Sequence, residues 1–276
     1  MNKPEISRPL IMGILNLTPD SFSDGGKFVL TENAINHALS MVNAGADIID
    51  IGGESTRPGS NRVSADLQKQ RIIETITRLR DLLPEEVSIS VDTTLSEVAQ
   101  TALEAGASII NDISAGNDDP ELINLVASRQ CPYIIMHMQG TPETMQDNPS
   151  YIDVINEIKT FLLNHAEAAE SAGVKKENII IDPGIGFGKT RDHNLEILNN
   201  LDQFTNTGYT VMLGTSRKRF MKSACKNASA QQLTSATCAT TVIGVYAGVK
   251  IFRVHDVLEN RQAADIAWEI KHHRNH

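Results

Sequence analysis

Eight short runs of apolar, often β-branched residues recur along the chain, and each ends in a polar or charged cluster. Between them lie stretches in which apolar residues recur with helical spacing. Strands and helices that alternate in this way form parallel sheets, because a parallel connection has to cross back over the sheet. The predicted strands span residues 10–17, 46–51, 87–91, 108–111, 133–136, 178–181, 209–213 and 250–253. The pattern predicts a (β/α)8 TIM barrel, and a doubly wound open sheet is the alternative.

Helices are expected between these strands and after the last one. The first should open at Thr31-Glu32-Asn33 and stop near Gly45, and another should begin at Asp119-Pro120. The remaining predicted helices span about residues 67–83, 95–104, 151–172, 216–246 and 257–272.

Length and composition suit one domain. The 276 residues are 41% hydrophobic, which suffices for one large core, and neither a linker nor a repeat divides them. We therefore expect a single domain over residues 1–276. The net charge of −9 argues against nonspecific nucleic-acid binding, although it leaves room for a local basic pocket.

The three cysteines, Cys131, Cys225 and Cys238, are odd in number and lack CxxC spacing. This pattern suits a reducing compartment and indicates neither a disulfide framework nor a zinc site. No apolar run reaches the length of a membrane span, and residues 1–9 lack the pattern of a secretory signal. The sequence predicts a cytoplasmic protein without a membrane partner.

Polar clusters at the strand ends hold most of the residues that could do chemistry. They are Asn16, Glu54-Ser55-Thr56-Arg57, Asp92, Asn111, Met136-His137, Asp182, Ser216-Arg217-Lys218 and Arg253-Val254-His255. A parallel barrel gathers the carboxyl ends of its strands on one face, where active sites of this fold lie. The pattern therefore favours an enzyme.

The segment from Asp182 to Thr190 is rich in glycine but fits no nucleotide loop. Pro183 stands where a P-loop needs its first glycine, and the Gly184/Gly186/Gly188 spacing misses GxGxxG by one residue. We expect a tight strand-to-helix turn that lets backbone approach a flat ligand. Asp182 could then accept two parallel N–H bonds from a guanidine-like ring edge, unless it only forms a structural Asp-Pro turn.

Two loops resemble lids, namely residues 16–26 and residues 52–59. The first carries an amide and one aromatic ring, and the second carries one arginine and two hydroxyls between glycines. Such loops suit closure over an anion, although either could be an ordinary solvent loop.

Cationic residues near the last strands indicate an anionic ligand. Three positive charges in Ser216-Arg217-Lys218-Arg219 fall at a predicted helix start, where cations need an anionic partner or water. Arg253 and His255 alternate along a strand end, so they share one side and suit a phosphate clamp.

Two acids, Asp50 and Asp92, could have purely structural roles. Asp92 could cap the following helix, and Asp50, flanked by isoleucines, suits burial with a structural partner. The candidate residues together suit a phosphorylated or pyrophosphorylated substrate with a nitrogen-rich ring, without naming the reaction.

Eight segments, in order along the chain, give a family resemblance. They are residues 12–24, 52–59, 90–93, 110–113, 136–139, 182–189, 216–218 and 253–256. With these segments the chain resembles the dihydropteroate synthases, the folate-pathway enzymes that sulfonamides target. The resemblance implies a (β/α)8 barrel, Mg2+ as cofactor, a homodimer and sulfonamides as inhibitors. In the family, para-aminobenzoate displaces pyrophosphate from the hydroxymethyl carbon of a dihydropterin pyrophosphate, and pyrophosphate leaves before the amine attacks.

The resemblance also implies a role for each matched residue. Pterin contacts fall to Thr56, Asp92, Asn111, Met136, Asp182, Phe187, Gly214 and Lys218. Pyrophosphate contacts fall to Asn16, Arg253 and His255, and Asn16 is also the implied metal ligand. The implied aminobenzoate site consists of Phe22, Thr56, Pro58, Phe187 and Ser216. Asp92, Arg57 and Lys218 are the implied catalytic residues.

One departure from the family pattern is Ala236, which precedes Thr237 where members often carry glycine. It bears on local helix packing and not on the pocket. Two other functions compete: a pterin-dependent methyltransferase, which would not need the Thr56-Arg57-Pro58 loop, and a non-catalytic pterin-binding paralogue that has lost its lids.

Overall fold

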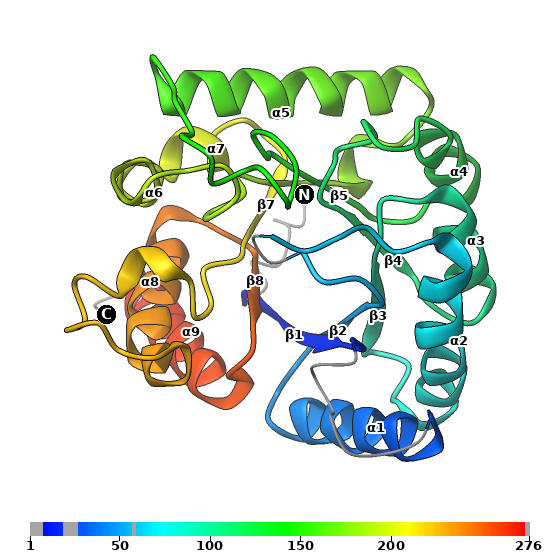
Figure 1. Cartoon of the computed structure of the whole chain (residues 1–276). Helices are drawn as coiled ribbons and strands as arrows, with labels where there is room; N and C mark the ends of the chain where they lie inside the picture. Colours follow the sequence, from blue (N-terminus) through cyan, green and yellow to red (C-terminus); the bar gives the residue numbers. More distant parts are fainter. Residues whose placement is uncertain (1–7, 19–26, 57–58, 274–276) are drawn as a thin grey trace, which may run out of the picture.

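The computed structural model describes residues 8–18, 27–56 and 59–273. Within these ranges eight parallel strands close into a barrel in sequence order, β1 to β8 (Figure 1). The strands are β1 (Leu10–Asn16), β2 (Ile48–Gly52), β3 (Ser88–Asp92), β4 (Ile109–Asp112), β5 (Tyr133–Met136), β6 (Ile179–Asp182), β7 (Thr210–Leu213) and β8 (Ile251–Val254). The predicted (β/α)8 barrel is confirmed, and each predicted strand agrees with the structure to within two residues at either end.

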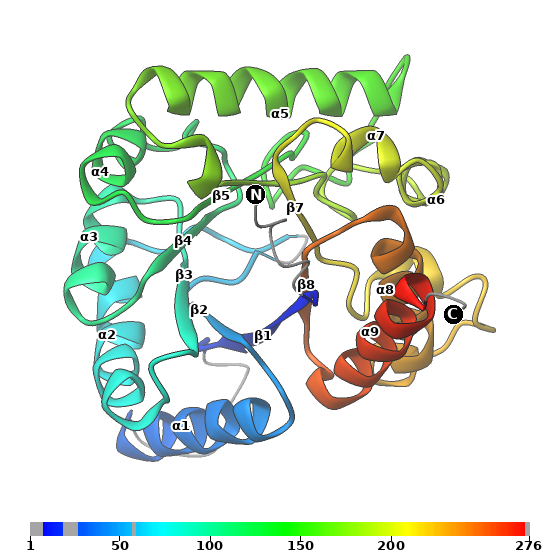
Figure 2. The same cartoon turned by 180° about the vertical axis from the view of Figure 1, so that it is seen from behind.

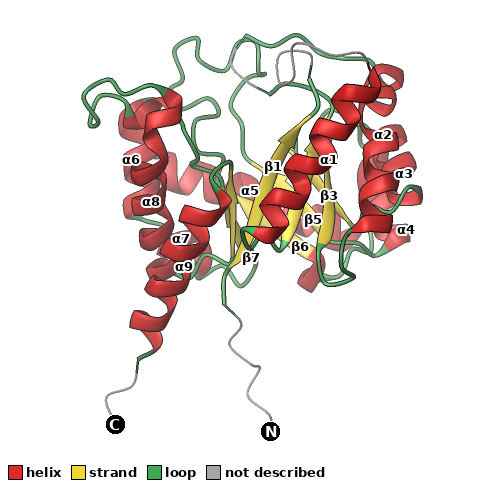
Figure 3. Cartoon of the chain, turned by 90° about the horizontal axis from the view of Figure 1, so that it is seen from below, coloured by secondary structure: helices red, strands yellow, loops and turns green. Residues whose placement is uncertain are grey.

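Helices surround the strands on the outside of the barrel (Figures 2 and 3). They are α1 (Lys27–Asn43), α2 (Ala65–Leu82), α3 (Ser96–Glu104), α4 (Glu121–Arg129), α5 (Val154–Ser171), α6 (Arg191–Asn199), α7 (Asp202–Thr205), α8 (Thr234–Ala247) and α9 (Val257–His272). Short 3-10 segments are η2 (Lys176–Asn178), η3 (Arg219–Met221) and η4 (Ala230–Leu233). No helix in these described ranges is both long and apolar enough to cross a membrane.

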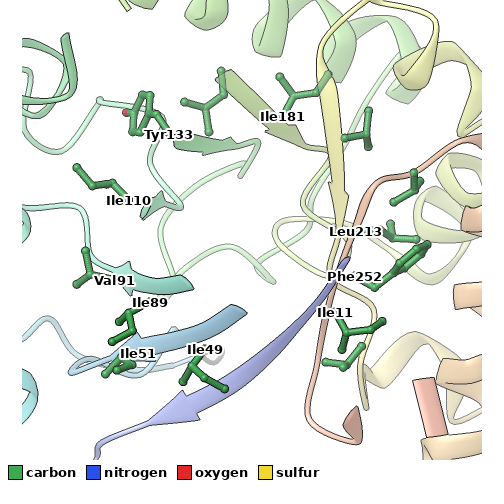
Figure 4. Close-up of a cluster of buried hydrophobic side chains, with 14 of the residues drawn as sticks. Ile11, Ile49, Ile51, Ile89, Val91, Ile110, Tyr133, Ile181, Leu213 and Phe252 are labelled. Atoms are coloured by element: carbon green, nitrogen blue, oxygen red, sulfur yellow. The ribbon is translucent and has the colours of Figure 1, made fainter. Parts of the chain in front are cut away.

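The two-residue alternation of each strand separates two cores. Outward side chains pack beneath the helices, among them Ile11, Ile49, Ile51, Ile89, Val91, Ile110, Tyr133, Ile181, Leu213 and Phe252 (Figure 4). Inward side chains form a smaller layer inside the barrel, made of Met12, Ile48, Ile109, Ile134, Ile180, Met212 and Ile251. This inner layer is buried and closes the barrel beneath the strand ends.

Two residues beyond this layer, polar side chains and a glycine join two apolar residues at the inward positions. These positions are occupied by Ile14, Asp50, Asn111, Met136, Asp182, Gly214 and Arg253. Because side chains two apart on a strand share a face, the fold itself aims these residues at one space above the inner layer. The strand alternation therefore explains how residues far apart in sequence come together.

Two predicted helices differ from the structure. Helix α1 begins at Lys27 and not at Thr31, and Thr31 is a buried residue inside the helix. The helical material predicted for residues 216–246 is interrupted in the structure, where η3, η4 and α8 occupy only parts of this range. Arg217 has a left-handed backbone with φ of 58°, which ends any helix there, and α8 begins only at Thr234.

The alanine that departs from the family pattern leaves α8 intact. Ala236 is half-buried within this continuous helix. Its neighbour Thr237 is fully buried, donates to the Leu233 carbonyl at 3.0 Å and accepts from the Arg217 amide at 3.2 Å. Helix packing at this point accommodates the methyl group.

Candidate active site

A pocket with a volume of about 800 Å³ opens above the inner layer, at the carboxyl ends of the strands. It brings together most of the residues singled out from the sequence: Asn16, Thr56, Asp92, Asn111, Met136, Asp182, Phe187, Gly214, Ser216, Lys218, Arg253 and His255. Phe22, Arg57 and Pro58 lie outside the described residues. The volume is in the range of small-molecule sites.

The pocket lining is strongly cationic although the chain is acidic. Its described lining contains the basic residues Lys189, Arg191, Arg217, Lys218, Arg219, Lys222 and Arg253. The lining contains two acids, Asp92 and Asp182, and the acids Asp256 and Asp50 outside it pair with Arg217 and Arg253. A concave surface with this excess of positive charge concentrates anions, so the expected local basic pocket is present.

Asp182 lies at the end of β6, almost fully buried, and its Oδ1 accepts from the Gly184 amide at 2.7 Å. Burial raises the pKa of this carboxyl, against the opposing charge of Lys218. Its other oxygen, Oδ2, faces Gly214: a Cβ atom added to Gly214 would lie 3.8 Å from this oxygen. The structural Asp-Pro turn and a ligand-facing carboxylate oxygen therefore coexist in one residue.

The three glycines after Asp182 form the expected tight turn. Gly184, Gly186 and Gly188 all have positive φ, between 62° and 83°. A Cβ on Gly184 would meet the His137 carbonyl at 1.9 Å, and one on Gly188 would meet the Gln139 carbonyl at 2.3 Å. Only glycine permits this backbone to lie against the segment that follows β5.

Phe187 and Lys218 form one wall of the pocket. The Lys218 ammonium lies 4.3 Å from the centroid of the Phe187 ring and donates to the Ile185 carbonyl. Burial lowers the pKa of Lys218 to about 7, against the opposing charge of Asp182. A flat ring between these side chains and Met136 would meet an aromatic face, a cation and a thioether.

Arg253 links Asp92, which lines the pocket, to the fully buried Asp50, which does not. It donates from Nε to Asp50 at 2.6 Å and from Nη2 to Asp92 at 2.8 Å. Burial raises the pKa of Asp92 to about 7; Arg253 opposes this rise and Asp50 adds to it. The predicted burial of Asp50 with a structural partner is confirmed.

The helix-capping alternative for Asp92 is wrong. Helix α3 starts after Leu95, and its Ser96 amide donates to Asp119 at 2.8 Å. Asp92 instead points into the barrel, because it continues the inward alternation of β3. Its pairing with Arg253 places it in the pocket.

The cations after β7 lie where the short 3-10 helix η3 begins, with Lys218 as its N-cap and Arg219 as its first residue, whereas Arg217 lies before it. Arg217 forms an ion pair with Asp256, with nitrogen–oxygen distances of 3.0 and 2.5 Å. Ser216 accepts from the His255 amide at 3.1 Å and lies 2.9 Å from His255 Nδ1. These contacts hold the β7 and β8 ends together, which explains why both clusters meet in one pocket.

The loop after β2 is anchored at its base. Glu54 accepts from the Gln68 side chain at 2.7 Å, and Arg71 donates to the Gly53 carbonyl at 2.7 Å. Beyond Thr56, the Gly59 amide donates to the Pro142 carbonyl at 3.0 Å. Gly59 therefore lies against the segment between β5 and α5.

Sequence reasoning missed that segment between β5 and α5. Met145 and Gln146 line the pocket, and Gln146 donates to the Gly186 carbonyl at 2.8 Å. Lys189 was also missed: it is buried, and its ammonium lies 2.9 Å from both His137 Nδ1 and the Phe187 carbonyl. The only signal for Lys189 was its place in the glycine-rich run, and loop residues such as Gln146 carry no periodic signal.

Comparison with known proteins identifies the family. The family model described as "Pterin binding enzyme" matches residues 12–255. The chain belongs to the pterin-binding enzyme family. A Synechocystis dihydropteroate synthase is 43% identical over 264 residues, which cover 95% of this chain and 91% of that relative.

Solved structures of pterin-binding enzymes share the whole barrel. Dihydropteroate synthase from Yersinia pestis, in complex with a sulfonamide drug, has a TM-score of 0.90 at 39% identity, covering 97% of this chain and 96% of its own. The enzyme from Xanthomonas albilineans, in complex with 7,8-dihydropteroate, has a TM-score of 0.87 at 34% identity, covering 98% and 96%. In this chain, the residues matched by the family model, 12–255, include the carboxyl end of every strand of the barrel.

Proposed function

We propose that this pterin-binding enzyme is a dihydropteroate synthase. It condenses para-aminobenzoate with 6-hydroxymethyl-7,8-dihydropterin pyrophosphate, forming 7,8-dihydropteroate and releasing pyrophosphate. The observation that carries the proposal is a pair of buried acids, Asp92 and Asp182, in a lining that holds seven basic residues. A substrate with a hydrogen-bond-donating ring at one end and two phosphates at the other matches that division of charge.

The pterin ring fits the deep part of the pocket. Asp182 would accept hydrogen bonds from the polar edge of the ring, and Asn111 would exchange hydrogen bonds with the same edge. Met136 and Phe187 would pack against the faces of the ring. Lys218, above the Phe187 ring, would hydrogen-bond the same pterin. These groups are buried or half-buried, so each hydrogen bond forms where water competes poorly.

The chemical step separates charge within this pocket. The bond between the hydroxymethyl carbon and the pyrophosphate oxygen breaks, and pyrophosphate leaves with the electron pair. Asp92 stabilises the cation left on the pterin, and Arg253 and His255 stabilise the departing anion. The aminobenzoate nitrogen then bonds to the carbon and loses one proton. Thr56 and Ser216 would hold aminobenzoate, with Phe22 and Pro58 expected from the two loops.

A magnesium ion fits this site as a partner of the pyrophosphate. No cluster of three or more His, Cys, Asp or Glu side chains that could hold a metal occurs in the described ranges. Asn16 offers one amide oxygen, Oδ1, beside Gly52 at the end of β2. Mg2+ prefers oxygen ligands and commonly binds substrate phosphates with few protein ligands. Asn16 would hold the ion, which would neutralise charge on the leaving pyrophosphate.

Two further properties extend the proposal. A homodimer is supported by side chains about half exposed on α8 and α9, namely Ile243, Tyr246, Leu258, Ile266 and Ile270. The two helices lie side by side, so these residues offer an apolar surface that a second copy could cover (Figures 1 and 2). Sedimentation velocity tests the dimer. A cytoplasmic location is supported by three free cysteines.

The experiment that tests the function uses labelled para-aminobenzoate, dihydropterin pyrophosphate and magnesium, with labelled dihydropteroate as the expected product. A parallel reaction offers a methyl-pterin donor, which a pterin-dependent methyltransferase would consume. Methyl transfer without condensation would favour that alternative. Pterin binding without either reaction would favour a non-catalytic paralogue.

The pH dependence of kcat/KM for the pterin pyrophosphate should reflect the protonation state of Lys218. Its pKa of about 7 means that the ammonium form is present below this pH and is lost as pH rises through it. We expect kcat/KM for the pterin pyrophosphate to fall on the alkaline side, since this parameter reports groups of the free enzyme. Lys218→Arg, whose guanidinium stays charged, should lose this alkaline fall, while any change on the acid side that comes from Asp92 should remain. Identical pH profiles for both proteins would contradict this role.

The two substrates should bind in order. Ser216, expected to contact aminobenzoate, lies 2.9 Å from His255, expected to contact pyrophosphate, so filling the anion site should fix the second site. We expect calorimetry to show weak binding of para-aminobenzoate to the free protein and tighter binding after a pterin and magnesium pyrophosphate are added. Equal affinity with and without these ligands would show that the second site is already formed.

A further inference from the structure

Asp50 is a fully buried acid that none of the roles above uses. It lies on β2, two residues beyond Ile48 of the inner layer, and therefore points into the barrel. It does not line the pocket, since it is fully buried. A buried charge in such a place is costly unless it is paired.

One oxygen of Asp50 holds side chains from two other strands. Oδ2 accepts from Arg253 Nε at 2.6 Å and lies 2.6 Å from Arg253 Nη2. The same oxygen accepts from Asn111 Nδ2 at 3.2 Å. Asp50 thus connects, from beneath, a residue expected to bind pyrophosphate and a residue expected to bind the pterin.

Arg253 makes more contacts with Asp50 than with Asp92. Two of its guanidinium nitrogens, Nε and Nη2, lie within hydrogen-bond distance of Asp50, whereas only Nη2 contacts Asp92, at 2.8 Å. Nη1 has no hydrogen bond to any other described residue. An anion that binds to Arg253 can therefore accept a hydrogen bond from Nη1 and replace Asp92 as the acceptor for Nη2. The hydrogen bond from Nε to Asp50 remains.

We propose that Asp50 is a positioning residue that keeps Arg253 and Asn111 in place while Arg253 exchanges its contact with Asp92 for the pyrophosphate. The exchange frees the Asp92 carboxylate for the pterin at the moment when the anion arrives. The inference rests on the proposed function, since it assigns the anion to a pyrophosphate on the pterin. Asp50 Oδ1 has no hydrogen-bond partner among the described residues, which costs stability and suits a functional reason for the acid.

Two substitutions of Asp50 separate positioning from charge. Asp50→Asn keeps a side-chain oxygen that can accept hydrogen bonds from Arg253 and Asn111, whereas Asp50→Leu removes it and keeps the branched shape of the side chain. We expect Asp50→Leu to lower kcat/KM for the pterin pyrophosphate by about tenfold or more, the scale of a lost charged hydrogen bond. KM for para-aminobenzoate should change much less. Asp50→Asn should recover most of the loss.

Asp112→Asn is the matched control. Asp112 is equally buried but bonds the Tyr133 hydroxyl at 2.8 Å and the Ser114 amide at 2.7 Å, away from the pocket. Its substitution should lower the melting temperature and change kcat/KM per folded molecule much less than Asp50→Leu does. A purely structural role for Asp50 would give the same pattern as this control.

A structure of the wild-type protein with magnesium pyrophosphate decides the matter if Asp50→Leu does not fold. We expect Arg253 Nε to remain on Asp50 and the contact between Arg253 and Asp92 to open. Departure of Arg253 from Asp50, normal kcat/KM in Asp50→Leu, or an Asp50→Asn variant as impaired as Asp50→Leu would overturn the inference. A wild-type chain that makes no dihydropteroate would instead refute the proposed function, so the two failures are distinct.

Discussion

Asp92→Asn should lower kcat by about 100-fold or more, the scale of losing one preorganised electrostatic contact. The substitution keeps the size of the side chain and much of its hydrogen bonding but removes the negative charge. A group that stabilises a cation formed only during ionisation acts more on turnover than on ground-state binding. Asp92 is 6% exposed, so little water can replace its charge. Steady-state kinetics with both substrates measure the effect.

Pterin affinity distinguishes this role from simple binding. In Asp92→Asn it should change less than it does when Asp182 is replaced. A variant with near-normal kcat, or one whose whole defect lies in pterin affinity, would return Asp92 to a binding role.

Asp182→Ala should weaken pterin binding by roughly 1.5–3 kcal/mol, the scale of a hydrogen bond to a charged group. Its carboxylate would pair with the guanidine-like edge of the ring, and its Oδ2 lies toward Gly214 in the pocket. Calorimetry with a pterin that lacks pyrophosphate isolates this contact, because the anion site then contributes nothing.

The same substitution also removes the bond from the Gly184 amide to Asp182 Oδ1. Asp182→Asn serves as the control, since it retains an acceptor for that amide while it loses the charge. If both variants fold and bind the pterin as tightly as the wild-type protein, Asp182 does not hold the ring.

The fold was predictable because the strands are buried, short and regularly spaced. The strand alternation then fixed which residues point inward, and most candidate site residues entered one pocket. The error over residues 216–246 has a local cause. Arg217 adopts a left-handed backbone that is held by tertiary contacts to Thr237 and Asp256, and helical spacing in the sequence does not reveal such contacts.

Side-chain pairing was the second thing that the sequence did not reveal. Arg253 and Asp50 are 203 residues apart, and nothing in either local sequence marks their contact. Gln146 and Lys189 are likewise held in the site by hydrogen bonds that they donate to backbone carbonyls of loop residues. Residues that act through such contacts need the folded chain to be recognised.

The central claim is that this chain joins a pterin to para-aminobenzoate with loss of pyrophosphate. The most direct test measures dihydropteroate and pyrophosphate in one reaction with purified protein, dihydropterin pyrophosphate, para-aminobenzoate and magnesium. We expect the two products in equal amounts, and dihydropteroate only when every component is present. Folded protein that binds the pterin but forms no dihydropteroate under these conditions would contradict the claim.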